Sequence, residues 1–155
     1  MSVTEGDPMP DIAMVRHDGE SVQPSDYRGR KLVLFFYPKD NTPGCTTEAK
    51  DFSALKDEFD AAGCALLGIS KDSTKKHQNF IAKHDLTVDL ATDAEEGGLS
   101  DELGVWAEKK MYGKTFMGMV RSTYLLDEQG KVARIWPKVK VAGHAEDVLA
   151  AIKAL

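Results

Sequence analysis

The stretch that decides the fold reads Leu32-Val33-Leu34-Phe35-Phe36-Tyr37-Pro38, followed by Lys39-Asp40-Asn41-Thr42-Pro43-Gly44-Cys45. Residues 32–37 form an unbroken apolar run rich in aromatic and branched side chains. Such a run predicts a strand buried on both faces, as in the parallel or mixed sheet of an α/β fold. Pro38 ends the strand, and Asn41-Thr42-Pro43-Gly44 forms a turn. The sequence therefore predicts a buried strand that leads through a proline-rich turn to Cys45.

A helix follows this turn, from about Thr46 to Ala62. Apolar residues recur at helical spacing, with polar residues on the other faces; they are Ala49, Phe52, Leu55 and Phe59. Gly63 is placed to cap the C-terminal end. The strand, the turn and the helix make up the first half of a βαβ unit.

The rest of the chain continues this alternation. Strands are predicted at 65–70, 88–92, 121–127 and 132–136, the last two joined by a glycine-containing turn at 128–131. Helices are predicted at 73–85, at 98–103 and at the C-terminus, where apolar positions mark an amphipathic face. Turns at Asp18-Gly19 and Arg28-Gly29 suggest a small hairpin at the sheet edge. The order predicts one thioredoxin-like domain over 1–155, with a central mixed β-sheet flanked by α-helices.

Composition and charge restrict the classes of partner. The 155 residues fit one domain, and the net charge of −5 comes from acids interspersed with lysines and arginines. This balance argues against nucleic acid or an anionic membrane as the main partner. No apolar stretch is long enough to span a bilayer, and the N-terminus lacks a signal-peptide pattern. We therefore expect a cytoplasmic protein.

Two cysteines, Cys45 and Cys64, are too few for a disulfide scaffold or a structural zinc site. Cys45 follows a strand and a Pro-Gly turn, in the first turn of the predicted helix. Unpaired backbone N–H groups and the positive end of the helix dipole lie there, and both favour a thiolate. Cys45 is therefore the candidate nucleophile.

The neighbours of Cys45 suit attack on a peroxide. The Thr42 hydroxyl can donate to an anionic sulfur or to a bound peroxide oxygen. Pro38 stiffens the loop and limits the access of water to the oxidised sulfur. Glu48, one helical turn after Cys45, is placed to orient a cation, although an acid in a first helical turn is favourable in any protein. Together they give the pattern Pro38-x-x-x-Thr42-x-x-Cys45-x-x-Glu48.

The segment Phe36 to Ala49 resembles the active-site signature of the peroxiredoxins, and more narrowly of the Q type, or bacterioferritin comigratory protein type. Similar features recur along nearly the whole chain, at Gly68-Ile69-Ser70, Trp106 to Gly118, Arg121-Ser122-Thr123 and Leu125-Leu126-Asp127. The resemblance implies a thioredoxin-like fold and a peroxidase that needs no cofactor and no metal.

The resemblance also implies roles for individual residues. Cys45 would be the peroxidatic cysteine, which becomes a sulfenic acid as the O–O bond of hydrogen peroxide or an organic hydroperoxide breaks. Thr42 and Arg121 would stabilise the thiolate and the charge developing on the peroxide oxygens, and only the resemblance lifts Arg121 above an ordinary surface arginine. The backbone N–H groups of Gly44 and Cys45 would hold a peroxide oxygen, beside Pro38.

The chain departs from the Q type at the resolving cysteine. Members of this type place it five residues after the first, where this chain has Lys50, or on the next helix, where residues 78–82 contain none. Cys64 lies beyond the far end of the predicted helix, roughly 27 Å away, and a disulfide needs Cα atoms within about 7 Å. We interpret Cys64 as structural, so no resolving cysteine is expected. An external thiol would recycle Cys45: thioredoxin, glutaredoxin with glutathione, or a small thiol. The resemblance suggests a monomer.

Other readings stay open at this point. A thiol–disulfide oxidoreductase on the same fold is weakened because Cys45 has no Cys-x-x-Cys partner, and a redox sensor would begin with the same chemistry. Residues 109–119 are either an ordinary loop or a mobile apolar wall that contacts alkyl peroxides or docks the reductase. His17, His77, His84 and His144 show no ligand spacing and are interpreted as solvated. The acidic run 93–96 is interpreted as a solvated turn and helix start.

Overall fold

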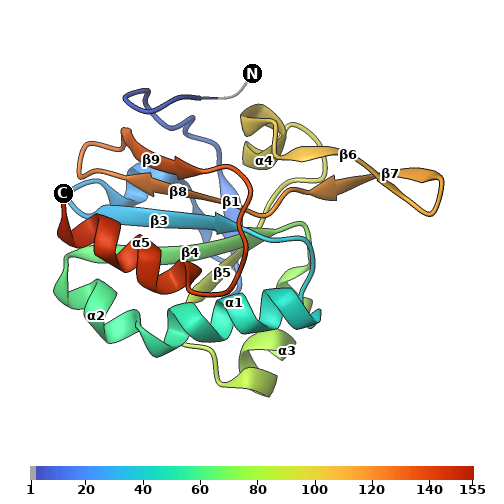
Figure 1. Ribbon diagram of the computed structural model, residues 1–155, viewed down its shortest axis with the longest axis horizontal. Helices are drawn as coiled ribbons and strands as arrows, with labels where there is room; N and C mark the ends of the chain where they lie inside the picture. The colour runs from blue at the N-terminus through green and yellow to red at the C-terminus, as the bar shows by residue number, and fades with distance from the viewer. Residues whose placement is uncertain (1–2) are drawn as a thin grey trace.

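The computed structural model describes residues 3–155 and places the predicted buried strand at the centre of a seven-stranded sheet (Figure 1). In order across the sheet, the strands are β2 (Ser21–Val22), β1 (Met14–Arg16), β5 (Asp89–Thr92), β4 (Cys64–Ser70), β3 (Lys31–Phe36), β8 (Ser122–Leu126) and β9 (Val132–Trp136). Strands β3, β4 and β5 run parallel, while β1, β8 and β9 pair antiparallel with their neighbours. The predicted mixed sheet is confirmed.

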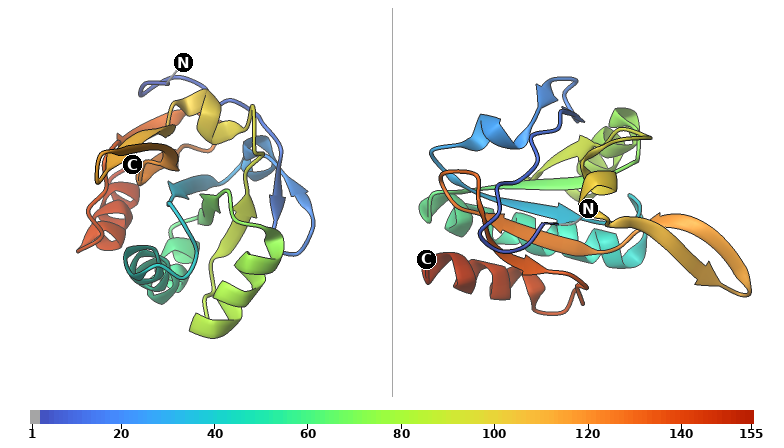
Figure 2. Two further views of the ribbon diagram at one scale, coloured as in Figure 1. Left: turned by 90° about the vertical axis from the view of Figure 1, so that its right-hand side faces the viewer. Right: turned by 90° about the horizontal axis from the view of Figure 1, so that it is seen from above.

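Helices cover the two faces of the sheet unequally. One face carries α1 (Pro43–Ala54), α2 (Lys56–Ala61), α3 (Thr74–His84) and α5 (His144–Lys153), whose apolar side chains form one core with β3, β4 and β5. The other face is covered by the short helix α4 (Leu99–Leu103), the 3₁₀ turn η1 (Pro24–Tyr27) and the N-terminal segment. Figure 2 shows these two layers edge-on. The thioredoxin-like arrangement follows from β3 and β4, which are buried on both faces.

The predicted helix over 46–62 is wrong in its bounds and in its continuity. It begins at Pro43, whose fixed φ suits a first helical position, and it breaks at Leu55, where α1 ends and α2 begins. The other predicted helices and strands are present with small shifts at their ends. The predicted N-terminal hairpin is also present, as the pair β1–β2 at the sheet edge.

Residues 109–119 do not form a loop. They belong to an antiparallel hairpin of β6 (Trp106–Met111) and β7 (Lys114–Met119), which makes a separate two-stranded sheet. Its two-residue turn has positive φ at both Tyr112 and Gly113, the backbone that a tight hairpin turn requires. Figure 1 and the right-hand view of Figure 2 show the hairpin extending away from the body of the molecule.

Over residues 3–155, none of the helices has the length and apolar character that crossing a lipid bilayer requires. The longest of them, α1, has 12 residues.

Candidate active site

Cys45 is the third residue of α1, where the chain leaves the C-terminal end of β3. Its side chain is only 2% exposed. The first backbone bond of the helix runs from the Thr46 N–H to the Thr42 carbonyl, so the N–H groups of Gly44 and Cys45 precede the helical ladder. The helix N-terminus therefore directs partial positive charge at a buried sulfur.

Arg121 reaches this sulfur from a distant part of the sequence. Its Nη2 donates a hydrogen bond to Cys45 Sγ at 3.3 Å, and its Nη1 donates to Glu48 Oε1 at 2.8 Å. The register between β3 and β8 explains why Arg121 lies near Cys45, because Ser122 at the start of β8 pairs with Phe36 at the end of β3. Arg121 therefore precedes β8 at the sheet edge where the loop to Cys45 begins.

Glu48 completes a buried triad with Arg121 and Cys45. Its side chain is 1% exposed, and among the described residues its Oε2 has no hydrogen-bond partner. Burial raises the pKa of Glu48 to about 7, although the Arg121 guanidinium acts in the opposite direction. Burial also opposes the charge on Arg121, but Glu48 and Cys45 outweigh it and the pKa of Arg121 is raised. The guanidinium therefore keeps its charge and serves two acidic groups.

The segment before Cys45 contains the remaining predicted residues, and Thr42 differs from its expected contact. A Cβ on Gly44 would lie 3.1 Å from Arg121 Nη2, so glycine leaves the guanidinium room beside the sulfur. Pro38 is half-buried at the end of β3. The Thr42 hydroxyl donates to the Lys39 carbonyl at 2.7 Å and not to the sulfur, because Thr42 closes the turn that precedes the helix.

Cys64 lies far from this site. It is the first residue of β4 and pairs with Lys31 at the start of β3, whereas Cys45 follows the end of β3. Six strand residues span about 20 Å. Both thiols are free and buried, and burial raises the pKa of Cys64 to about 12. Its sulfur therefore stays a thiol inside the core.

Two features beside the site were missed in the sequence. The Lys109 ammonium in β6 donates a hydrogen bond to the carbonyl of Met119, which is two residues before Arg121. Burial lowers the pKa of Lys109, with a further contribution from Arg121 and an opposing one from Cys45, which places this cation near both groups. Neither alternative for 109–119, an ordinary loop or a mobile apolar wall, predicts this contact, because only a paired hairpin folds Lys109 back against Met119.

The second feature is a buried cluster beneath the loop between β3 and α1. Asp40 accepts a hydrogen bond from the Tyr37 hydroxyl at 2.6 Å, and its other oxygen lies 2.7 Å from His77 Nδ1. His77 is 0% exposed and lies 3.1 Å from the Ala91 carbonyl through Nε2. The expectation of a solvated His77 is therefore wrong. His144 is buried as well.

Asp93 also contradicts the interpretation of the acidic run as solvated. It is 2% exposed, and its carboxylate accepts hydrogen bonds from the backbone N–H groups of Leu99 and Ser100 at the start of α4. Asp93 therefore fixes a helix terminus. Glu95 and Glu96 are exposed, as expected.

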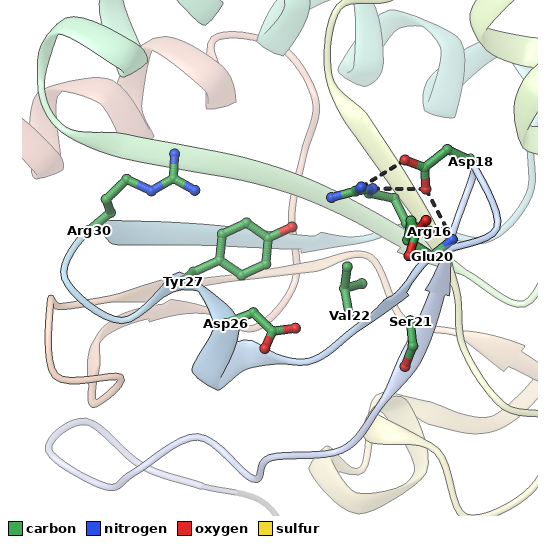
Figure 3. A pocket seen from close by; sticks show the side chains of 8 residues that line it. All are labelled: Arg16, Asp18, Glu20, Ser21, Val22, Asp26, Tyr27 and Arg30. Atoms are coloured by element: carbon green, nitrogen blue, oxygen red, sulfur yellow. Dashed lines mark hydrogen bonds and ion pairs between the residues drawn. The ribbon is translucent and has the colours of Figure 1, made fainter.

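A large hollow in the surface lies elsewhere. It measures about 470 Å³ and is surrounded mostly by charged and polar side chains (Figure 3), which are Arg16, Asp18, Glu20, Ser21, Val22, Asp26, Tyr27 and Arg30. Arg16 and Asp18 form an ion pair of 2.7 Å across its rim. Neither cysteine lines this hollow, so it is separate from the Cys45 triad.

A thioredoxin-like fold with a thiol at a helix N-terminus and an arginine on it defines a class of cysteine enzymes. The AhpC/TSA family model matches residues 5–135, and the chain belongs to this family.

Similar proteins narrow the assignment to one type within the family. Peroxiredoxin Bcp of Xanthomonas campestris pv. campestris is 54% identical over 83% of this chain and 79% of its own length. Peroxiredoxin Bcp of Bacillus subtilis is 42% identical over 99% of this chain and 97% of its own. The resemblance to peroxiredoxins of the Bcp, or Q, type is thereby confirmed.

Solved structures agree. One of them is a structure of the X. campestris bacterioferritin comigratory protein, which was solved to study alkyl peroxide reduction by that protein. It is 46% identical to this chain with a TM-score of 0.89, and the match covers 97% of this chain and 98% of that one. A cysteine-to-serine variant of Xylella fastidiosa PrxQ is 37% identical with a TM-score of 0.92, covering 99% and 98% of the two chains. The thioredoxin-like fold is confirmed.

Proposed function

We propose that Cys45 performs the thiol-dependent peroxidase reaction of this peroxiredoxin. The observation that carries the proposal is the hydrogen bond from Arg121 Nη2 to Cys45 Sγ at the N-terminus of α1. The membership of the family gives the enzyme a peroxide substrate and a thiol reductant. The geometry of the Cys45 triad supports the roles that we propose for the residues of this chain.

In the first half-reaction the Cys45 thiolate attacks one peroxide oxygen. The S–O bond forms as the O–O bond breaks, and the other oxygen leaves as hydroxide or alkoxide and takes up a proton. Arg121 and the backbone N–H groups of Gly44 and Cys45 are fixed donors around the place where this negative charge develops. Hydrogen peroxide and organic hydroperoxides share the O–O group that these donors bind.

Three further residues assist the reaction. Glu48 holds the second arm of Arg121 and so aims the first arm at the sulfur. Pro38 shields the oxidised sulfur from water. The Thr42 hydroxyl donates to the Lys39 carbonyl, which leaves the lone pairs of its oxygen available to accept a hydrogen bond from a protonated peroxide.

In the second half-reaction an external thiol reduces the Cys45 sulfenic acid. Cys64 is the only other cysteine of the chain, and it lies at the opposite end of β3. Thioredoxin, glutaredoxin with glutathione, or a small thiol are the candidate reductants. The same lack of a partner cysteine argues against a thiol–disulfide oxidoreductase. We further infer a monomer in the cytoplasm, where two free thiols stay reduced.

Intact mass measured on reduced protein after one equivalent of hydrogen peroxide, with a sulfenic-acid trap, tests the proposal. We expect rapid gain of one oxygen or of the trap at Cys45, and no gain in Cys45→Ser. The loss of two hydrogens would indicate a Cys45–Cys64 disulfide and overturn the one-cysteine mechanism. An unmodified Cys45 would overturn its role as the nucleophile, and turnover with a thiol reductant separates an enzyme from a sensor.

A further inference from the structure

The β6–β7 hairpin concentrates the exposed apolar surface of the molecule. Six large apolar side chains are exposed among residues 3–155, and four of them lie on this hairpin: Met111 at 58%, Tyr112 at 95%, Phe116 at 44% and Met117 at 51%. Tyrosine, phenylalanine and methionine are enriched at protein–protein interfaces. An apolar patch of this kind, projecting from the body (Figure 1), indicates a surface that contacts another molecule.

The turn residue Tyr112 supports this interpretation. Its φ is +52°, a backbone conformation that asparagine and glycine adopt more readily than tyrosine. Its ring is almost fully exposed, so packing within the chain does not favour it at this position. An aromatic ring at this solvent-facing position is available for contact with a partner.

The charge of the hairpin differs in sign from that of the whole molecule. Lys109, Lys110 and Lys114 against Glu108 make residues 106–119 positive, while the chain carries −5. Lys110 and Lys114 flank the apolar tip on opposite strands of the pair. This patch complements a partner whose surface is apolar at the centre and acidic at the rim.

The hairpin is also next to the reactive sulfur. It projects from the end of the sheet where β3 finishes and α1 begins, as Figure 1 and the right-hand view of Figure 2 show. Its last residue, Met119, precedes Arg121 by two positions, and the Lys109 ammonium donates a hydrogen bond to the Met119 carbonyl. On the other side, the Lys71 ammonium lies 4.9 Å from the centre of the Trp106 ring and fixes the hairpin base. A partner held by the hairpin would therefore stand beside Cys45.

We propose that the β6–β7 hairpin docks a protein dithiol with an acidic rim, which reduces the Cys45 sulfenic acid. This proposal rests on the proposed function, and it favours a protein over a small thiol as the reductant. A small thiol needs only the sulfur, whereas Tyr112 and its neighbours extend well beyond the site. A second copy of this chain is the alternative occupant, and the experiment separates the two.

The chemistry balances without any further component. A thiolate of the dithiol attacks the Cys45 sulfur, an S–S bond forms, and the S–O bond breaks to release hydroxide, which leaves as water after protonation. The second thiolate of the dithiol then attacks the other sulfur of the dithiol, which is bonded to Cys45 in this mixed disulfide. Cys45 leaves as a thiolate, and the dithiol ends as a disulfide after giving two electrons.

The test uses Tyr112→Asn in the full chain. Asparagine tolerates the left-handed backbone, so the turn is retained while the ring is lost. We expect the second-order rate of reduction of oxidised Cys45 by an acidic bacterial thioredoxin to fall about tenfold, as for an interface hot spot. The rate with dithiothreitol and the rate of oxidation by hydrogen peroxide should stay unchanged. A second variant, Lys110→Glu with Lys114→Glu, should slow the reduction of oxidised Cys45 by thioredoxin further. The rate of that reduction should also depend less on salt concentration.

Matched controls are Val15→Thr, an exposed apolar residue on the far strand β1, and Lys153→Glu at the end of α5. Both should keep the rate of the unmodified chain. Equal thioredoxin rates in all variants, or a wild-type rate no faster with thioredoxin than with dithiothreitol, would overturn the docking proposal. A change of sedimentation with unchanged thioredoxin rate would assign the hairpin to self-association instead. Failure of Cys45 to oxidise appears in the separate peroxide step and counts against the proposed function.

Discussion

Arg121 divides its guanidinium between Glu48, at 2.8 Å, and Cys45, at 3.3 Å. Because the pKa of Glu48 is about 7, the electrostatic stabilisation that Arg121 gives to the Cys45 sulfur depends on pH. Below about pH 7 the Glu48 carboxyl group is neutral and no longer attracts the guanidinium as an anion. Above it, a carboxylate competes for the same cation.

The first prediction concerns Glu48→Gln, which keeps the shape of the side chain without the charge. The pKa of Glu48 rises on folding from 4.5 to about 7, so the folded state holds a proton that the unfolded chain releases. The free energy of unfolding of the wild type should therefore fall, relative to the variant, as the pH rises from about 4.5 to about 7, and then level off. Urea unfolding at several pH values measures this difference.

The rate of Cys45 oxidation should depend on the ionisation of the same group, Glu48. In the wild type the rate has an inflection near pH 7 that Glu48→Gln removes, whereas Glu58→Gln on the exposed side of α2 leaves it in place. An inflection that persists in Glu48→Gln would assign the titration to another residue.

Gly44→Ala is the second prediction. The added methyl group would lie 3.1 Å from Arg121 Nη2 and push the guanidinium from the sulfur. The rate of Cys45 oxidation by hydrogen peroxide should fall about tenfold, since a lost electrostatic donor commonly costs that much or more. Stability should hold or rise, because alanine favours a helix by about 1 kcal/mol over glycine. Lys50→Ala, on the same helix, is the control, and full activity in Gly44→Ala would contradict the close approach.

At this scale the sequence predicts the position of the proposed nucleophile better than the positions of the residues that contact it. Cys45 follows from a strand, a turn and a helix that are local in sequence. Arg121 meets it only through the pairing of β8 with β3, which no local pattern contains, and the family resemblance supplied it. Lys109 has no local signal at all, because its bond to Met119 requires the hairpin to close.

At the scale of elements, the loop between β3 and α1 is held by buried polar groups. Asp40 binds Tyr37 and His77 through its side chain, and its N–H donates to Asp72 Oδ2 at 2.8 Å. Asp72 also accepts from the Ser70 hydroxyl at the end of β4. The loop that carries Thr42 and Gly44 is therefore fastened to the end of β4 and to α3.

His77→Leu is the third prediction. The substitution removes the His77 ring from one oxygen of the buried Asp40 side chain and leaves Tyr37 as its remaining side-chain partner. The free energy of unfolding should fall by about 3 kcal/mol, because a buried pair is broken. Denaturant unfolding at constant m value measures it. Adding Asp40→Asn should recover part of the loss, because the unpaired charge is then removed.

The exposed pair of His17 and Asp89 is the matched control for this measurement. It is 3.2 Å long and its side chains are 25% and 48% exposed. His17→Leu should change stability by less than about 1 kcal/mol. Equal losses in the two histidine variants would contradict the role assigned to the buried cluster.

The elements that the sequence predicted are those whose apolar pattern is strong. Strands β3 and β4 are buried throughout, and their runs are unbroken. The hairpin was missed because β6 and β7 face solvent, so neither shows an apolar alternation, and tyrosine is an unusual residue for its turn. His77 was misplaced because its helix is mostly polar, and the burial of α3 against Tyr37 and Ala91 is a tertiary effect.

At the scale of the whole molecule, two apolar cores share one sheet. Leu34 and Phe36 point into one core, while Val33 and Phe35 of the same strand point into the other. Any loss of β3 therefore exposes both cores at once, and the layers cannot unfold separately.

The fourth prediction is a single cooperative transition for residues 1–155. Calorimetry should give a van't Hoff enthalpy equal to the calorimetric one, as for other one-domain proteins of this size. Tryptophan fluorescence, from Trp106 on β6 and Trp136 on β9, and far-ultraviolet circular dichroism should report the same midpoint. Two transitions, or midpoints that differ between the two probes, would contradict one domain.

The separation of Cys45 from Cys64 along β3 has a consequence for the lifetime of the enzyme. A sulfenic acid that no neighbouring thiol captures remains open to a second oxidant molecule. That encounter gives a sulfinic acid, which ordinary thiols do not reverse. Under the proposed one-cysteine mechanism, the enzyme would therefore lose activity whenever oxidant arrives faster than reductant. The inactive fraction would then record how long a cell's supply of reducing power has fallen behind demand.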